Sequence, residues 1–204
     1  MSATLSDKLA CVSFPTLGHF LEDGFADHGM RSLLANVRMI GRAVTLQLAD
    51  ADALAVNQAL ARIEPGDVLV IDMQGDHAHA PVGAVTATAA RQAGAAGIVI
   101  DGVATDVLEL RGIGLPVFAR GTSVLTTKRR GLNTSGHDVP VRCGGVRVDP
   151  GMFVLGDDNG LLFADASTLQ DVIETALASD RAEPAILARL NANEPVPSVL
   201  GIAC

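Results

Sequence analysis

The pattern of apolar and polar residues predicts a βαβ unit in the middle of the chain. Apolar runs at 66–72 and 97–101 are typical of buried strands, and the alanine-rich run 84–95 between them predicts a helix. Such a crossover favours a parallel pair of strands. In open α/β sheets, ligands bind outside the carboxyl ends of the strands. We therefore expect any site to lie on the two polar loops that leave these ends, 73–83 and 102–106.

The flanking sequence predicts further helices and strands. Thr16 is a candidate cap for a short N-terminal helix, and Ser167 is one for a long amphipathic helix. The glycine-rich and Asp-Pro-Gly turns after 137 are typical of an all-β segment. The expected elements are one or two short helices within 1–30, a strand at 40–48, a helix at 49–63, a short helix at 107–111, a strand and turn at 114–121, a surface loop at 122–136, strands at 139–143, 145–148 and 152–155 within an all-β segment 137–163, a helix at 169–190 and a poorly specified tail from 191.

This order of elements indicates the class of fold. A βαβα order followed by a β-rich segment and a closing helix suggests an α/β protein built as a three-layer β/β/α domain, in which a mixed sheet packs on a second, smaller sheet. No internal repeat or low-complexity linker divides the 204 residues. We therefore expect a single domain over 1–204, with N-terminal helices in 1–30 and a C-terminal helix and tail in 167–204.

Composition and charge narrow the choice of partners. The chain is 49% hydrophobic and 19% charged, which suits one compact domain. Its net charge of −8 argues against a nucleic-acid-binding surface. We expect the one basic cluster, Lys128 to Arg130, to lie on a loop and not to contact a polyanion. Three separated cysteines predict reduced thiols in the cytoplasm. Neither a secretory signal nor an apolar run of about 20 residues is visible, so we expect no membrane association.

One group of polar side chains on loop 73–83 has possible chemistry. Asp76, His77 and His79 form a His-x-His pair beside a carboxylate, which suits a transition metal. A histidine there could also act as an acid or base near neutral pH. The simpler interpretation is a solvated loop with two incidental histidines. On the next strand end, Asp101 is better suited to holding the backbone than to chemistry, and Gly102 to serving the turn.

Several short segments, taken together, resemble the RraA-like proteins, which include the 4-hydroxy-4-methyl-2-oxoglutarate aldolases and the regulators of ribonuclease E activity. Each segment alone is weak evidence, but the order and spacing of all of them are specific to this family. They are Gly41-Arg42-Ala43-Val44-Thr45, Pro65 to Asp72, Gly75-Asp76 with Ala80 and Gly83, Ala96 to Gly102, Pro116 to Gly121, Gly144-Gly145-Val146, Val148, Pro150-Gly151, Gly156-Asp157 and Gly160.

The resemblance implies a fold, an assembly and a site. It implies a swivelling β/β/α domain and a homotrimeric ring, sometimes doubled to a hexamer. In the aldolases the site lies between subunits, where the loop equivalent to Gly83, Ala84, Val85 and Thr86 offers backbone amides to a pyruvate-like carboxylate. Asp106 occupies the position that holds a divalent metal, usually magnesium, although manganese or another ion is also possible. The reaction implied is a retro-aldol cleavage that yields pyruvate, with oxaloacetate decarboxylation as a related activity.

The sequence departs from this pattern at two site positions. The aldolases carry an arginine where this chain has Thr105, and an acid that helps to hold the waters of the metal where it has Ala84. Losing a charge-assisted bond removes about 1.5–3 kcal/mol of interaction. A single carboxylate also binds magnesium weakly.

Other residues could compensate for these changes. Arg120 and Arg42 are candidates to supply the missing positive charge, and their simpler role is in structural ion pairs. Asp106 has a simpler role too, as the N-cap of the helix at 107. Family members can also use an acid from a neighbour's C-terminal region, for which the candidates are Glu174, Glu183 and Glu194.

Two functions therefore compete. The first is a metal-assisted lyase acting on a small 2-oxo or 2-hydroxy acid, with a site altered at Thr105 and Ala84. The second is a non-catalytic, protein-binding regulator of the ribonuclease E inhibitor type, and the acidic charge of the chain suits a protein partner better than RNA. A methyltransferase activity, a label that this family has also carried, is disfavoured because no glycine-rich S-adenosylmethionine loop follows the first strand.

Overall fold

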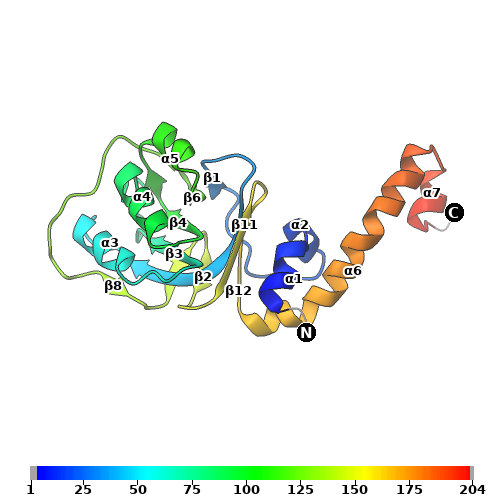
Figure 1. Ribbon diagram of the computed structural model, residues 1–204, viewed down its shortest axis with the longest axis horizontal. Helices are drawn as coiled ribbons and strands as arrows, with labels where there is room; N and C mark the ends of the chain where they lie inside the picture. The colour runs from blue at the N-terminus through cyan, green and yellow to red at the C-terminus, as the bar shows by residue number, and fades with distance from the viewer. Residues whose placement is uncertain (1–3, 203–204) are drawn as a thin grey trace. The chain divides into compact units, whose positions relative to one another are not determined.

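A computed structural model describes residues 4–202, and its elements are labelled in Figure 1. By its internal contacts the chain forms two compact units. The larger unit is Asp23–Ala166, and the smaller one combines the described parts of Met1–Glu22 and Ser167–Cys204.

The larger unit is built on one mixed sheet whose centre is parallel. Its strand order is β1-β6-β4-β3-β2-β11-β12, and β8 pairs with the end of β2. The pairs β2–β3, β3–β4 and β4–β6 are parallel, as expected for the central βαβ unit. The remaining pairs are antiparallel. The strands are β1 (Arg31–Ser32), β2 (Arg38–Gln47), β3 (Asp67–Asp72), β4 (Gly97–Asp101), β6 (Val117–Ala119), β8 (Gly136–His137), β11 (Phe153–Asp157) and β12 (Gly160–Ala164).

Three helices cover one face of this sheet, as Figure 1 shows. They are α3 (Ala53–Leu60), α4 (Ala84–Gln92) and α5 (Val107–Ile113). Their buried side chains are mostly small, and they pack with Leu, Ile and Val from the strands in one apolar cluster. Alanine lets the helix backbone approach the sheet closely, which explains how a chain without Trp or Tyr still buries this face.

A small hairpin covers the opposite face of the sheet. Its strands β9 (Val141–Cys143) and β10 (Val146–Val148) pair with each other and contribute Val141, Cys143 and Val148 to a second apolar cluster. A further two-stranded sheet joins β5 (Val103–Ala104) to β7 (Gly121–Thr122). The expected α/β class is confirmed, with a mixed sheet between a helical layer and a second small sheet.

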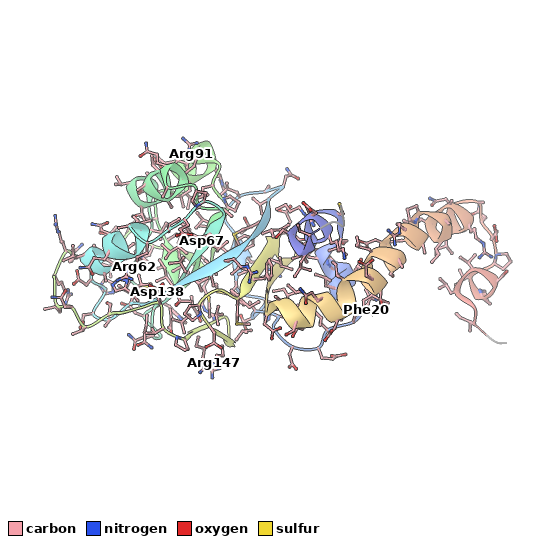
Figure 2. All side chains as sticks on the ribbon, turned by 60° about the horizontal axis from the view of Figure 1, so that its bottom comes forward. Phe20, Arg62, Asp67, Arg91, Asp138 and Arg147 are labelled. Carbon is pink, nitrogen blue, oxygen red and sulfur yellow. The ribbon has the colours of Figure 1, made fainter. Side chains whose placement is uncertain are left out.

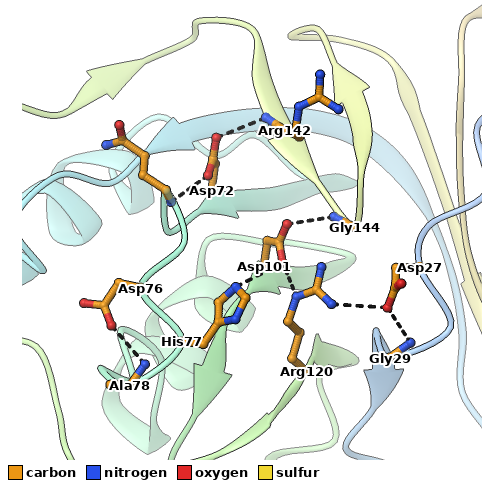
Figure 3. Close-up of polar contacts among 11 residues, drawn as sticks. Asp27, Gly29, Asp72, Asp76, His77, Ala78, Asp101, Arg120, Arg142 and Gly144 are labelled. Carbon is orange, nitrogen blue, oxygen red and sulfur yellow. Dashed lines mark hydrogen bonds and ion pairs between the residues drawn. The ribbon is translucent and has the colours of Figure 1, made fainter.

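Carboxylates at the ends of two central strands fasten this hairpin to the sheet (Figure 3). Asp72 accepts a hydrogen bond of 3.1 Å from the Arg142 N–H, and Asp101 accepts one of 2.9 Å from the Gly144 N–H. The expectation that Asp101 holds backbone is confirmed. The two residues that end the parallel strands therefore position the second sheet.

The boundaries of some elements differ from those predicted. The helix expected over 49–63 is shorter, because Asp52 caps it by accepting from the Leu54 N–H at 2.9 Å. The helix expected over 84–95 ends at Gln92, and Gly94 follows in a left-handed conformation. Strand β12 was not among the predicted strands, although the turn at Asp157 to Gly160 that joins it to β11 was. An ion pair of 2.8 Å between Arg62 and Asp138, both labelled in Figure 2, ties the end of α3 to the segment after β8.

The smaller unit is helical. It contains α1 (Leu5–Cys11), α2 (Phe14–Leu17), the long α6 (Ala166–Asn191) and α7 (Val196–Leu200) within the predicted tail. Lys8 of α1 pairs with Glu174 of α6 at 2.6 Å. None of the helices in residues 4–202 has both the length and the apolar character of a membrane span.

Two predicted caps in this unit are wrong. Thr16 lies inside α2, and its hydroxyl donates to Asp180 of α6 instead of capping a following helix. Ser167 lies in the first turn of α6, because that helix already begins at Ala166. In both cases a cap was predicted one to three residues from where the helix starts, which is the usual uncertainty of a boundary read from sequence.

Candidate functional site

The amino terminus of α4 leaves backbone donors pointing out of the helix. The first N–H groups of any α-helix have no acceptor inside it. Here the Ala87 N–H bonds to the Gly83 carbonyl at 2.9 Å, and the Ala84 N–H donates to the Asp106 carboxylate at 2.9 Å. Within residues 4–202, the N–H groups of Val85 and Thr86 make no hydrogen bond. These two amides can therefore receive an anionic group of a ligand.

Asp106 reaches this helix from the loop after β5. Its backbone is left-handed (φ 56°, ψ 44°), which is uncommon for a residue with a side chain. It stands at the N-cap position of α5 but makes no side-chain bond to that helix. Instead, Oδ2 accepts from Ala84, and Oδ1 lies 3.3 Å from the Thr105 hydroxyl that donates to it. The expected cap on α5 is therefore wrong, because the side chain caps α4.

These groups border a small pocket in the larger unit. Its volume is about 190 Å³, which suits a ligand smaller than the drug-sized molecules that typical pockets accept. Of the residues expected to bind substrate or metal, Gly83, Val85, Thr86, Thr105 and Asp106 line it together. Ala84 is not among the lining residues, although its N–H fixes Asp106. The structure thus brings two sequence-distant loops to one place.

The wall opposite α4 was not predicted. Asn57 of α3 and Thr126 and Thr127 of the predicted surface loop also line the pocket. This part of the loop is held on both sides by backbone hydrogen bonds, including Thr127 N–H to Ala80 O at 3.2 Å and Lys128 N–H to Ala51 O at 3.1 Å. No local sequence signal marks this wall, because its partners lie far away in the chain.

The pocket offers a limited set of donors for a metal ion. Asp106 is the only acidic or imidazole side chain among its lining residues. A carboxylate has about four acceptor sites, so two remain beside the bonds to Ala84 and Thr105. That fits a magnesium-like ion, which keeps several waters and needs only one or two carboxylates. No cluster of three or more metal-binding side chains occurs among residues 4–202.

The two loop histidines turn to different carboxylates. His79 Nδ1 lies 2.7 Å from Asp76 Oδ2, whereas His77 Nε2 lies 3.9 Å from Asp101 Oδ1 (His77, Asp76 and Asp101 are drawn in Figure 3). Burial opposes ionisation of Asp76, but hydrogen bonds from Ala78, from the His79 N–H and from the His79 ring outweigh it and lower its pKa. The structure does not bring the two imidazoles together around one ion.

Asp76 and His79 belong to a different pocket from Asp106. This second pocket has a volume of about 470 Å³ and lies at the carboxyl ends of β2 and β3, where Asp50, Gln74 and Arg130 also line it. None of its lining residues is shared with the Asp106 pocket. Asp76, His77 and His79, considered above as auxiliary site residues, therefore do not line the Asp106 pocket of this chain.

The two arginines considered as substitute cations make structural contacts. Arg120 pairs with Asp101 and, at 3.2 Å, with Asp27 (Figure 3), and its bond to Asp101 raises the pKa of the guanidinium. Arg42 donates to the Gly151 carbonyl at 2.8 Å and stacks on the Phe153 ring. Neither lines the Asp106 pocket. The C-terminal acids Glu174 and Glu194 likewise pair within their own unit, with Lys8 and Arg189.

Comparisons with known proteins agree with the fold. A protein from Halalkalibacterium halodurans, provisionally named as a 4-hydroxy-4-methyl-2-oxoglutarate aldolase, is 35% identical over 147 residues, 72% of this chain and 69% of the relative. The solved structure of Streptomyces coelicolor RraAS2, described as an unusual member of the RNase ES inhibitor RraA family, is 28% identical and has a TM-score of 0.74. That similarity covers 93% of this chain and 97% of RraAS2.

A second solved structure and a family profile agree with these two. The RNA-processing inhibitor RraA from Thermus thermophilus is 30% identical over 80% of this chain and 93% of its own, with a TM-score of 0.64. The family profile described as Aldolase/RraA matches residues 2–163, most of the sequence. On the strength of that match and of the relative that is 35% identical, the chain belongs to the RraA-like family.

Proposed function

We propose that this protein is a divalent-metal-dependent lyase, which cleaves a small 4-hydroxy-2-oxo acid by retro-aldol chemistry and releases pyruvate. The observation that carries the proposal is the meeting of Asp106 with the free amides of α4 in one small pocket. Aldolase is also the name given to the relative from Halalkalibacterium halodurans. We propose magnesium as the ion, with manganese as a substitute, and a trimeric ring as the assembly.

The residues of the chain divide the work of binding. The N–H groups of Val85 and Thr86 receive the carboxylate of the substrate, aided by the positive end of the α4 dipole. Asp106 would hold the ion, and its bond to the Ala84 N–H keeps the carboxylate beside the same helix end. When held by Asp106, a divalent ion would supply Lewis-acid chemistry, polarising the 2-oxo group of the substrate.

Thr105 gives this site a neutral hydrogen-bond donor where the aldolases have a charged arginine. Its hydroxyl can offer one neutral hydrogen bond, and in the structure it donates to Asp106. Removing a charged donor to a developing oxyanion typically costs about 10²–10³ in rate. We therefore expect turnover that is slower than in a site with an arginine at this position.

The experiment is an assay of pyruvate release from 4-hydroxy-2-oxopentanoate with magnesium, with manganese and with a chelator. We expect release that depends on the metal, that is lost in Asp106→Ala and that persists in Glu109→Ala. Glu109 is a matched control, because it is an exposed acid three residues further on that does not line the pocket. Release that the chelator leaves unchanged, or that survives in Asp106→Ala, would refute the proposal.

A second candidate is a non-catalytic regulator that binds another protein. It is favoured by the single carboxylate of the pocket and by similarity to RraAS2 over almost the whole of both chains. A protein of this kind would purify without metal and would release no pyruvate in this assay with magnesium or with manganese. The same assay therefore separates the two candidates.

A further inference from the structure

The wall of the Asp106 pocket opposite α4 combines two distant parts of the chain. Three of its lining residues, Ala53, Val56 and Asn57, belong to α3. The others lie in the polar segment 126–134 that follows β7, where the first two residues line the pocket. The wall therefore forms only when this segment is held against α3.

Backbone hydrogen bonds hold only the first residues of segment 126–134. The Lys128 N–H donates to the Ala51 carbonyl at 3.1 Å, and the Lys128 carbonyl accepts from the Ala53 N–H at 2.9 Å. In the part of the chain that the structure describes, residues 129–134 make no backbone–backbone hydrogen bond, and all of them are exposed. A stretch with so few contacts and so little burial opens readily unless another group holds it.

One buried carboxylate bonds to both parts of the wall. Asp52 is only 2% exposed. Its Oδ1 accepts from the Leu54 N–H of α3 and from the Arg130 N–H, both at 2.9 Å, and its Oδ2 accepts from the Leu132 N–H at 2.9 Å. Burial raises the pKa of this carboxyl, but the backbone N–H bonds outweigh it and lower the pKa, so the side chain is ionised at neutral pH.

The set of partners requires the carboxylate of Asp52 and not merely a helix cap. A carboxylate accepts through both oxygens, whereas an asparagine would present an NH₂ group to one of the N–H donors. A serine is shorter, so its hydroxyl would reach the Leu54 N–H but not the segment. Serine and asparagine are both good N-caps, so replacing Asp52 by either keeps the cap of α3 and weakens the bonds to segment 126–134 alone.

We infer that Asp52 is a positioning residue for the Asp106 pocket: its carboxylate fastens segment 126–134 to the start of α3 and so keeps Thr126 and Thr127 opposite α4. Asp52 does not line the pocket itself, so it acts through the wall. Because this pocket is the proposed site of catalysis, the inference rests on the proposed function and adds a residue to it.

The first measurement is the rate of cleavage by trypsin under native conditions, with the cut sites identified by mass spectrometry. Lys128, Arg129 and Arg130 are exposed and supply cleavage sites within the segment. In Asp52→Ser, cleavage at these sites should be at least about tenfold faster, because two hydrogen bonds to a charged group are lost. Cleavage after Arg91 of α4, also exposed, should keep the parent rate.

The second measurement is the KM and the kcat of magnesium-dependent pyruvate release. In Asp52→Ser we expect KM to rise about tenfold and kcat to stay within about threefold, because the wall contacts the substrate alike in the ground state and the transition state. Asp52→Asn should fall between the parent and Asp52→Ser in both measurements. Asp50→Asn is the matched control, because it alters an exposed carboxylate that contacts the same segment only through the Thr134 hydroxyl.

Each outcome has a distinct meaning. Parent rates of cleavage within the segment of Asp52→Ser would overturn the inference, as would equally faster cleavage after Arg91, which would show that the larger unit opens as a whole. Faster cleavage of the segment with an unchanged KM would also overturn it and leave the proposed function standing. If the parent protein releases no pyruvate, the proposed function is wrong, and the cleavage pattern alone then decides whether Asp52 holds the wall.

Discussion

At the scale of single residues, the proposed function depends most on Asp106, which would hold the divalent ion. Its left-handed backbone turns the carboxylate away from its own helix and towards the Ala84 N–H of another. Positions with such unfavourable backbone angles persist where the surrounding structure requires them, and they are frequent at functional sites. The geometry also depends on the absence of a side chain at Gly83.

Gly83→Ala should disturb Asp106 directly. A Cβ at position 83 would overlap Asp106 Oδ2 and lie 2.8 Å from Thr105 Cγ2, so the aspartate must move. Overpacking of this kind costs about 1–3 kcal/mol of unfolding free energy. We also expect slower metal-dependent release of pyruvate, because Asp106 is displaced. Gly112→Ala is the control, because nothing lies within 4 Å of its added Cβ. Equal stability of the two variants in thermal unfolding would contradict the geometry.

His137 predicts a pH dependence of stability. Burial disfavours its charged form, Arg62 adds to this effect, and the pKa is lowered despite Asp138. The unfolded chain therefore binds more protons between the folded pKa and the unfolded value near about 6.5. Stability should fall as the pH drops from about 7.5 through this window and level off below the folded pKa.

The measurement is urea unfolding of the parent and of His137→Gln at several pH values. Within residues 4–202, Nδ1 of His137 is buried without a hydrogen-bond partner, so the variant should lose part of this slope. His19→Gln, at an exposed position in the smaller unit, should keep it. A slope that is the same in all three proteins would show that His137 is not its source.

The sequence predicted some of these residue roles and not others. Asp101 was expected to hold backbone because it ends a buried strand, and Gly144 is its partner. The direction of Asp106 depends on a left-handed backbone conformation, which no local pattern indicates. The His-x-His pair suggested a shared ion, but His79 contacts Asp76 whereas His77 lies near Asp101.

At the scale of elements, α4 is shaped by its small residues. Ala87 and Ala90 are fully buried against the sheet, and the helix begins at a glycine that makes room for Asp106. Close packing of this helix fixes where its free amides point. The scaffold and the site are therefore linked through one element.

Ala90→Leu should destabilise the protein. Added methylene groups in a closely packed interior typically cost about 1–3 kcal/mol of unfolding free energy. Ala61→Leu, at an exposed position after α3, should change the same quantity by less than about 0.5 kcal/mol. Denaturant unfolding measures both, and equal stability of the two variants would mean that α4 has spare room against the sheet.

Elements with strong periodicity were predicted well, and those held by distant partners were not. The strands at 67–72 and 97–101 follow from continuous apolar runs. Segment 126–128 was predicted to be surface loop because its sequence is polar, whereas its backbone partners Ala80 and Ala51 lie more than 40 residues away in sequence. A wall of the pocket was missed for that reason. Strand β12 was missed because a second strand after a short turn adds no new pattern to a β-rich run.

At the scale of the whole molecule, the proposed trimer and the proposed catalysis depend on each other. The resemblance places the site of the aldolases between subunits, and one chain supplies a single acidic side chain to the pocket. Sedimentation analysis should give a mass of about 63 kDa or a multiple of it, three chains of 21.0 kDa each. A mass of one chain at assay concentration would contradict the ring and leave the lyase with the residues of one subunit.

The most direct measurement of the central claim is the exchange of the methyl protons of pyruvate with deuterated water, followed by proton NMR. Pyruvate is the proposed product and a monoanion, so exchange tests the chemistry of the site without depending on the full substrate. The account predicts exchange that requires magnesium or manganese, disappears in Asp106→Ala and persists in Glu109→Ala. No exchange by the metal-loaded parent protein, or equal exchange in Asp106→Ala, would contradict it and favour the protein-binding regulator.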